Sequence, residues 1–217
     1  MALAPWLKKH LKDSDLKLIE DAVTEGEKNN SAQIIPMVVR SSTGTGHVPL
    51  ILTLLLLCLV LLVDRRLEFF VPPDKTMYLW LAELLVISIV APLLSKFNFV
   101  KRLFTARHDQ AHQVHVRAEI EFYERGLNQT SHSTGILLFV SLLERRAVVL
   151  ADKSIAAKLP DIAWREVVAC LVKGVKRDHL AGGFVDAIQM CHNLVMPHFP
   201  ASSSDKNEIT NQLVIAE

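Results

Sequence analysis

Two long apolar runs lie close together in the middle of the chain and limit what it can fold into. They are VPLILTLLLLCLVLLV (Val48 to Val63) and MYLWLAELLVISIVAPLLS (Met77 to Ser95). A helix rises about 1.5 Å per residue and a hydrocarbon core is roughly 30 Å thick, so each run is about long enough to cross it. The first run has no charged residue and the second has only Glu83. The sequence therefore predicts a transmembrane hairpin with soluble chain on both flanks.

The hairpin places both flanks on the same side of the bilayer, where they can pair into one domain. About forty polar and amphipathic residues precede the first run and no small-residue cleavage site follows it, so it is not interpreted as a signal peptide. Lys and Arg near the spans are more frequent on the outer flanks than in the loop, although Arg65 and Arg66 lie directly at a span end. This balance predicts cytoplasmic termini.

Length and charge restrict the remaining possibilities. With about a fifth of 217 residues in the hairpin, the chain has room for one soluble domain of ordinary size. The formal net charge is +1, which gives no argument for a nucleic-acid partner. The first dozen residues, MALAPWLKKHLK, are basic and are interpreted either as a membrane-surface segment or as an exposed helix start.

The soluble flanks contain alternating helix and strand patterns. Apolar residues at helical spacing predict a helix from Asp15 to near Lys28. The following segment QIIPMVVR (Gln33 to Arg40) predicts a short buried strand, and Pro36 within it predicts a sheet edge or a bulge. After the second run, a polar helix is expected over residues 104–125, with Gly126 as its left-handed cap.

The next segment predicts a β-hairpin. GILLFVSLL (Gly135 to Leu143) is apolar almost throughout, so both faces of this strand should be covered. Glu144 and Arg145 form a tight turn, where exposed charge is the expected arrangement, and RAVVLAD (Arg146 to Asp152) returns antiparallel.

The whole pattern predicts an α/β fold with a small mixed sheet. Its first two strands would be parallel and joined by a crossover that contains the hairpin. Two helices are expected after the β-hairpin, over residues 161–176 and about 181–196. The expected organisation is residues 1–47 and 96–200 as the two parts of one domain, 48–95 as the transmembrane hairpin (spans at about 48–63 and 77–95), and 201–217 as a disordered tail.

Three segments resemble a known family. RGLNQTSHSTGILLFVSLLERRAVVLADKSI (Arg125 to Ile155) resembles the central signature of TPM-domain proteins, most closely the bacterial membrane subgroup in which a span pair interrupts the domain. EKNNSAQIIPMVVRSS (Glu27 to Ser42) resembles that subgroup's first strand, and VHVRAEIEFYERG, beginning at Val114, resembles the helix before the central strand. The resemblance implies a Rossmann-like α/β/α TPM domain.

The resemblance implies less about activity. Some soluble TPM domains are described as acid phosphatases or metal binders, with acidic residues just before the central strand. The corresponding loop here, NQTSHST, has no Asp or Glu, and Asp152 alone does not supply the oxygen ligands that a hard cation needs. We therefore expect a non-catalytic interaction or assembly module of the membrane that has no cofactor. The alternative is a phosphatase-like hydrolase acting on phosphoesters, as in some relatives.

Partners and location follow from the same reading. The lipid bilayer is the first expected partner, together with a protein partner or a second copy of the chain. The expected location is the bacterial inner membrane, with both termini and the soluble domain in the cytoplasm.

Two groups of polar residues are candidate sites. An anion or substrate could bind at one edge of the sheet, although turn chemistry and strand capping explain the same residues, which are Arg125, His132, Thr134, Asp152 and Lys153. Three histidines share one helix face at i, i+4 and i+7, a spacing that suits a transition metal but equally suits a solvated face: His108, His112 and His115.

Overall fold

The computed structural model describes residues 3–44, 46–67, 76–130, 133–201 and 209–216. The chain divides into two compact units: unit 1 consists of residues 1–42 and 111–217, and unit 2 consists of residues 43–110.

Unit 1 is built on a four-stranded mixed sheet with the strand order β3-β2-β1-β4. The strands are β1 (Gln33–Val39), β2 (Gly135–Ser141), β3 (Arg146–Ala151) and β4 (Val214–Ala216). β1 and β2 are parallel, from Gln33 opposite Gly135 to Val39 opposite Ser141, and β3 is antiparallel to β2. The predicted α/β class, parallel crossover and β-hairpin are therefore confirmed.

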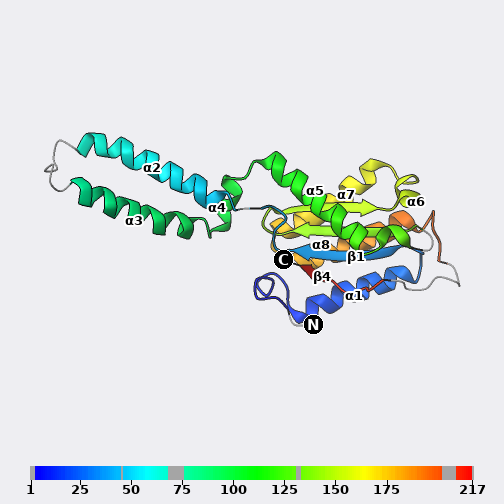
Figure 1. The fold of residues 1–217 in the computed structure, drawn as a ribbon. Helices are drawn as coiled ribbons and strands as arrows, with labels where there is room; N and C mark the ends of the chain where they lie inside the picture. The colour runs from blue at the N-terminus through cyan, green and yellow to red at the C-terminus, as the bar shows by residue number, and fades with distance from the viewer. Residues whose placement is uncertain (1–2, 45, 68–75, 131–132, 202–208, 217) are drawn as a thin grey trace. The chain divides into compact units, whose positions relative to one another are not determined.

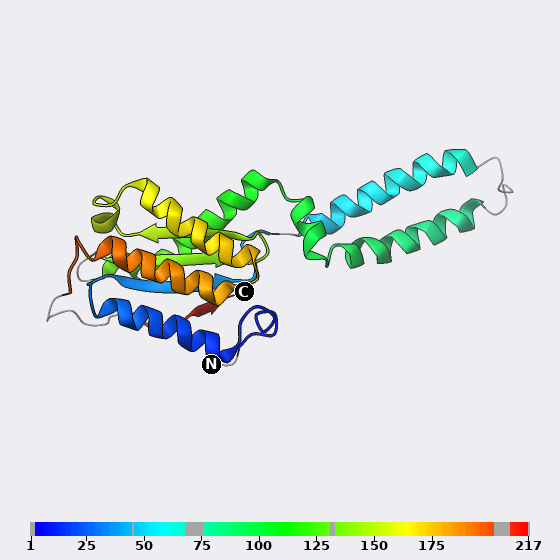
Figure 2. The ribbon, with the colours of Figure 1, turned by 180° about the vertical axis from the view of Figure 1, so that it is seen from behind.

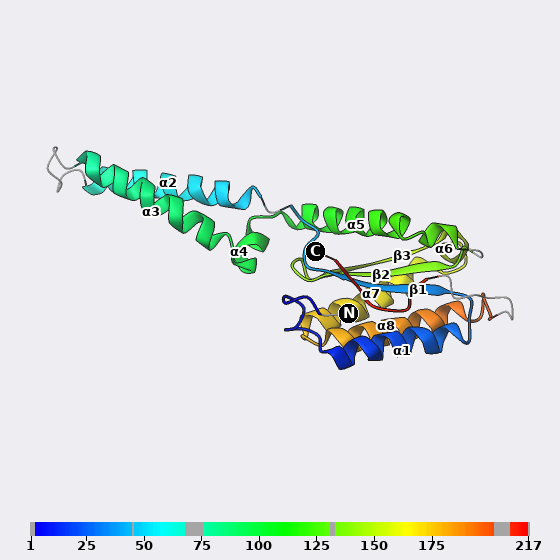
Figure 3. The same cartoon turned by 60° about the horizontal axis from the view of Figure 1, so that its bottom comes forward.

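Helices cover both faces of this sheet (Figure 3). One face carries α1 (Asp13–Glu27), α7 (Asp161–Lys176) and α8 (Leu180–Val195), which lie in front of the strands in Figure 2. The other face carries α5 (Arg107–Glu124), whose residues from Ala111 onward belong to unit 1. The short α6 (Lys153–Ala156) and the 3-10 turn η1 (Leu127–Gln129) complete the connections.

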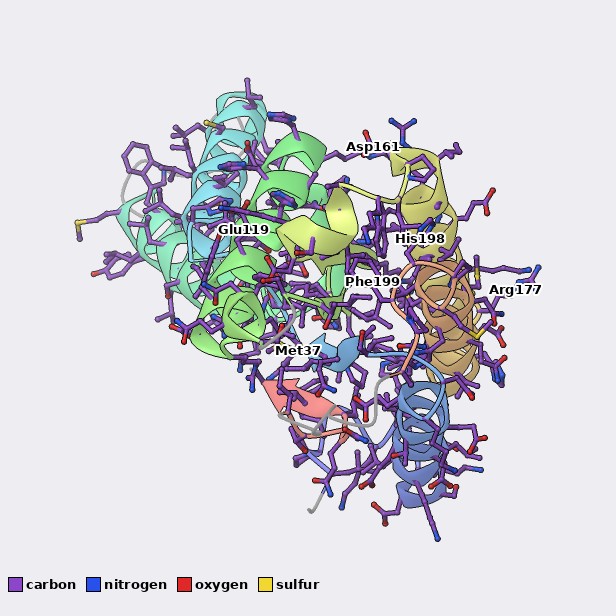
Figure 4. All side chains as sticks on the ribbon, turned by 90° about the vertical axis from the view of Figure 1, so that its right-hand side faces the viewer. Met37, Glu119, Asp161, Arg177, His198 and Phe199 are labelled. Atoms are coloured by element: carbon purple, nitrogen blue, oxygen red, sulfur yellow. The ribbon has the colours of Figure 1, made fainter. Side chains whose placement is uncertain are left out.

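The core follows from the two-residue period of the central strands. All seven residues of β1 and of β2 are buried, as expected for strands covered on both faces. Ile34 and Leu138 face α1, α7 and α8, whereas Met37 and Phe139 face α5. Met37 lies in the interior of unit 1 in Figure 4. Each such side chain contributes about 1.5–3 kcal/mol of burial free energy, so these two strands form the centre of the core.

The position of Pro36 differs from the prediction, because β1 lies inside the sheet and not at its edge. The Gln33 N–H donates to the carbonyl of Thr134 beside β2, whereas the Arg40 N–H donates to Ala216 beside β4. Amide groups alternate along a strand, so the missing N–H of Pro36 points toward β4. β4 pairs with β1 only from Met37 onward, and the proline therefore costs no ladder bond.

The chain's last segment also differs from the prediction. Residues 201–217 were expected to be disordered, but Val214–Ala216 form β4 and pair parallel with β1. The side chain of Asn211 donates from Nδ2 to Glu27 Oε2 at 2.8 Å and to Thr24 Oγ1 at 3.0 Å, which holds the segment against α1. A three-residue apolar strand suffices because β1 offers it a free edge.

The N-terminal residues were expected to be exposed or membrane-bound, and this prediction is wrong for their apolar side chains. Leu3, Leu7 and Leu11 are buried in the same core cluster as α1 and α8, while Lys8 and Lys9 remain exposed. The four-residue spacing of the leucines places them on one face of the turns over residues 5–10, so this face enters the core.

Unit 2 contains two long apolar helices, α2 (Val48–Leu67) and α3 (Thr76–Leu94), followed by the short α4 (Asn98–Leu103). α2 and α3 lie side by side (Figure 1), with Val48, Leu52 and Ala91 buried between the helices of this unit. Among the described residues, Met77–Leu94 is the one helical stretch that is long and apolar enough to cross a membrane, and Val48–Val63 is apolar but shorter.

Candidate functional site

The edge predicted as a site lies at the amino end of β2, and its residues have structural partners. Thr134 is buried, its Oγ1 donates to the carbonyl of Ser31 at 2.7 Å, and its N–H donates to Thr130 Oγ1 at 3.0 Å. Thr134 therefore ties the loop before β2 to the segment before β1. His132 lies outside the described residues.

Asp152 lies at the same end of the sheet and caps α6. Its N–H donates to the carbonyl of Gly135 at 2.9 Å, and its Oδ1 accepts from the Lys153 N–H at 2.6 Å. Its Oδ2 is buried and has no hydrogen-bond partner among the residues that the structure describes. The Lys153 side chain is exposed. The structure thus brings Thr134 and Asp152 to one end of the sheet, beside Gly135.

Arg125 is engaged elsewhere. Its Nη2 lies 3.0 Å from Glu121 Oε2, and Arg117 Nη2 lies 2.9 Å from the other oxygen of the same carboxylate. Glu121 is only 4% exposed, so its charge needs both guanidinium groups. Arg125 is therefore a structural ion-pair residue on α5 and does not extend an anion site at the sheet edge.

The three histidines on α5 are individually exposed, and the His115 imidazole is 3.3 Å from Glu119. Within the described ranges, no group of three or more His, Cys, Asp or Glu side chains is placed to hold a metal ion. The metal prediction for His108, His112 and His115 therefore gains no support, and the solvated-face interpretation describes these side chains adequately.

A buried histidine that the sequence does not reveal also lies at the amino end of the sheet. His192 on α8 is 7% exposed, and Asn30 Nδ2 donates to its Nδ1 at 2.8 Å. Burial lowers the pKa of His192 to about 4, so the ring is neutral at pH 7. Because Nδ1 accepts from Asn30, the proton lies on Nε2, which is buried and has no hydrogen-bond partner among the described residues. Gly26 makes room for the ring, since a Cβ there would lie 1.8 Å from it.

The opposite, carboxyl end of β1 and β2 contains a buried carboxylate. Glu144 was expected to be exposed in a turn, but it is only 3% exposed. Both its oxygens lie 3.3 Å from the Ser42 N–H, and it also accepts from the hydroxyls of Ser41, at 3.2 Å, and Ser141. Parallel strands bring their carboxyl ends together, and the serine donors that follow β1 and end β2 stabilise this charge away from water.

A small cavity lies at this same end of unit 1 and is strongly basic. It measures about 200 Å³, and its polar lining consists of Lys9, His10, Arg145, Lys176 and Asp178. His10 Nδ1 is 2.6 Å from Asp178 Oδ1. Ligands of open α/β sheets bind beyond the carboxyl ends of the strands, so this end is the better candidate for a functional site.

Sequence reasoning missed this site because its members come from three segments that are distant in the chain. Arg145 was assigned to an ordinary turn, and Lys9 to a surface segment. The one sequence signal was the pair of strands with a charged turn directly after the second. That signal predicts at which end of the sheet a site could lie, but it does not predict which distant residues meet there.

Comparison with known proteins supports the fold alone. No protein-family model and no curated protein matches this chain. Its structure is similar to the NMR structure of the BA42 protein from the psychrophilic bacterium Bizionia argentinensis, with a TM-score of 0.59 and 17% sequence identity over 95% of each chain.

Proposed function

We propose that the chain is a membrane-anchored TPM-domain protein in which α2 and α3 form a transmembrane hairpin and unit 1 is a non-catalytic interaction or assembly module. The observation that carries the anchor is the apolar surface of α3. Five successive side chains, Met77 to Leu81, are each at least 39% exposed. Five residues at 3.6 per turn pass around the whole helix, so every side of α3 presents apolar surface there.

Such a surface suits lipid better than water. Only 11% of the Met77–Leu94 stretch is buried within the folded chain. A helix that is apolar all round belongs either in a large core or in a membrane, and among the described residues of unit 2 only one comparable helix, α2, covers α3. A bilayer removes the remaining surface from water without requiring a further protein.

The TPM assignment and the module role are supported by the sequence resemblance and by the engagement of the candidate residues. A Rossmann-like α/β/α domain interrupted between its first two strands is compatible with the parallel pairing of β1 and β2. Thr134 and Arg125 make structural bonds, which favours an interaction role over catalysis. The resemblance and the positive flanks favour the bacterial inner membrane, with unit 1 in the cytoplasm.

The phosphatase-like alternative is favoured by one observation, the buried Asp152 Oδ2 without a partner among the described residues. It requires phosphoester turnover by the purified full chain that is lost in Asp152→Ala. Equal turnover in both proteins would exclude Asp152 as the reacting group.

The anchor is tested by placing a charge on exposed apolar positions of both units. Leu85 on α3 is 63% exposed and Leu18 on α1 is 55% exposed. In a bilayer, Leu85→Lys costs about 2.5–3.5 kcal/mol at mid-helix, so this variant should be released from membranes by alkaline carbonate while the wild type is retained. Leu18→Lys is the matched control and should remain membrane-bound.

Equal retention of the two lysine variants, or a wild type found in the soluble fraction, would contradict the anchor. The module role is tested separately by pull-down from native membranes with the full chain and with a variant that retains only residues 43–110. We expect the full chain to retain a defined protein partner, or a second copy of itself, that the variant lacking unit 1 does not retain. If both proteins retain the same partners, the module role is contradicted.

A further inference from the structure

The basic cavity at the carboxyl end of the sheet collects charge that the chain as a whole does not have. The formal net charge of the protein is +1, yet three cations line this one cavity: Lys9, Arg145 and Lys176. All three side chains are exposed, and within the described ranges none of them makes a hydrogen bond or an ion pair. Asp178 is the one carboxylate among the described lining residues, and His10 already occupies it. Three cations therefore face one carboxylate, which leaves an excess of positive charge in the lining.

The backbone around the cavity is unusual in two of the three segments that form it. Arg145 has φ 52° and Asp178 has φ 56°, and in the described chain only one further non-glycine residue has a positive φ. A left-handed conformation costs about 1 kcal/mol or more for most residues with a Cβ but is tolerated by Asp, so this cost falls on Arg145. Arg145 lies in the turn between β2 and β3 and Asp178 lies just after the end of α7, so these two residues set where both segments turn at the cavity.

The volume of the cavity and the charge of its lining restrict which ligands can bind there. A cavity of about 200 Å³ is smaller than the roughly 300–1,000 Å³ that drug-sized ligands and cofactors occupy. Leu180, the first residue of α8, and Lys176, the last residue of α7, both line the cavity, so the positive and negative ends of two helix dipoles offset each other and the field comes from the charged side chains. A compact anion with more than one negative charge matches this arrangement.

We propose that this cavity binds a phosphate group, with Arg145 as the bidentate donor and Lys9 and Lys176 as flanking charges. A guanidinium fork matches two phosphate oxygens, and a phosphate at neutral pH carries about 1.5–2 negative charges, which balance the three cations once the Asp178 carboxylate in the same lining is counted. Asp178 does not contact the phosphate in this arrangement but holds His10, and with it the N-terminal segment, at the rim of the cavity. The phosphate is either free or the headgroup of an anionic phospholipid.

The test is calorimetric titration of the full chain in non-ionic detergent, so its result does not depend on whether the hairpin spans a membrane. The probes are inorganic phosphate, short-chain dihexanoyl phosphatidic acid, and dihexanoyl phosphatidylcholine as the lipid control. Binding of one of the two phosphate probes is expected, and it should weaken at least about tenfold in Arg145→Gln/Lys176→Gln. Arg165→Gln/Lys28→Gln removes the same charges from exposed positions outside the cavity and should bind as the wild type does.

The outcomes separate the two phosphate sources. Binding of inorganic phosphate supports a free-phosphate site, and binding of phosphatidic acid alone supports a headgroup site. No heat with either probe, or equal binding by the two double variants, overturns the proposal. Thermal unfolding of each variant shows whether a loss of binding comes from a loss of folding. If the double variant unfolds at a lower temperature than the wild type, the titration is repeated with Lys176→Gln alone, because this side chain is exposed.

Discussion

The two ends of the β1–β2 pair differ in how they handle polar groups. At the amino end, Thr134 and the neutral His192 form short bonds with uncharged partners, Gly135 packs tightly against Leu127, and the buried carboxylate of Asp152 caps α6. At the carboxyl end, Glu144 keeps a buried carboxylate and a cavity lined by cations opens nearby. The amino end is therefore closed by packing, whereas the carboxyl end retains unbalanced charge that a ligand could use.

The difference teaches that polar residues at a strand end do not by themselves make a site. The amino end attracted the sequence-based prediction because hydroxyls, His132 and Asp152 cluster there in the sequence. Most of those whose positions are described serve turns and caps. The carboxyl end was assigned to surface charge, and it has both the cavity and an excess of cations in its lining.

The largest expected effect tests whether the amino end is closed by packing. In Gly135→Ala the added Cβ would lie 2.2 Å from the carbonyl oxygen of Leu127, a backbone atom that cannot rotate away. We expect a loss of about 3 kcal/mol in the free energy of unfolding, measured by urea denaturation of the full chain in detergent. Gly44→Ala meets nothing within 4 Å and is the control. Similar stability of both variants would show that this end is loosely packed.

The next effect compares the two buried carboxylates. Glu144→Ala leaves the Ser42 N–H and two hydroxyls without their acceptor, so about 2–3 kcal/mol of unfolding free energy should be lost. Asp152→Ala removes one capping bond at the opposite end and should cost about 1 kcal/mol. Glu144→Gln keeps one acceptor oxygen and should fall between them. Equal costs at the two ends would contradict the greater dependence of the carboxyl end on charge.

The third expected effect, smaller than those of Gly135→Ala and Glu144→Ala, is the pH response of His192. Its pKa is about 4 in the folded chain and about 6.5 when unfolded, so the unfolded state binds more protons below pH 6.5. The His192 contribution is complete above pH 6.5 and decreases as the pH falls toward 4. About 2 kcal/mol of unfolding free energy should be lost between pH 7 and pH 5.

Glu27 changes the free energy of unfolding with pH in the opposite direction, so its titration must be removed by substitution for this measurement. Burial raises its pKa to about 7, against a hydrogen bond from Asn211 that lowers it, so its protonated form stabilises the fold as the pH falls. The measurement therefore uses the Glu27→Gln background, with Glu27→Gln/His192→Gln as the control that should respond less between pH 7 and pH 5. Identical curves for the two proteins would show that His192 does not titrate as described.

The sequence was sufficient wherever a pattern repeats over many residues. The seven-residue apolar strands and the helix Asp161–Lys176 were predicted because burial on both faces and helical periodicity leave direct patterns. β4 was missed because three residues carry too little pattern to distinguish a strand from a tail. The burial of Glu144 and the composition of the basic cavity depend on which distant segments meet, and this information is absent from any local stretch.

The split of unit 1 has a consequence for biosynthesis. Gln33 on β1 pairs with Gly135 on β2, so the ribosome must deliver both apolar helices before the first strand gains its central neighbour. During that interval β1 has two unpaired edges and a composition that is apolar except for Gln33, and such segments aggregate readily. The apolar strand β1 therefore stays without its central neighbour on the nascent chain until translation has passed Ser141.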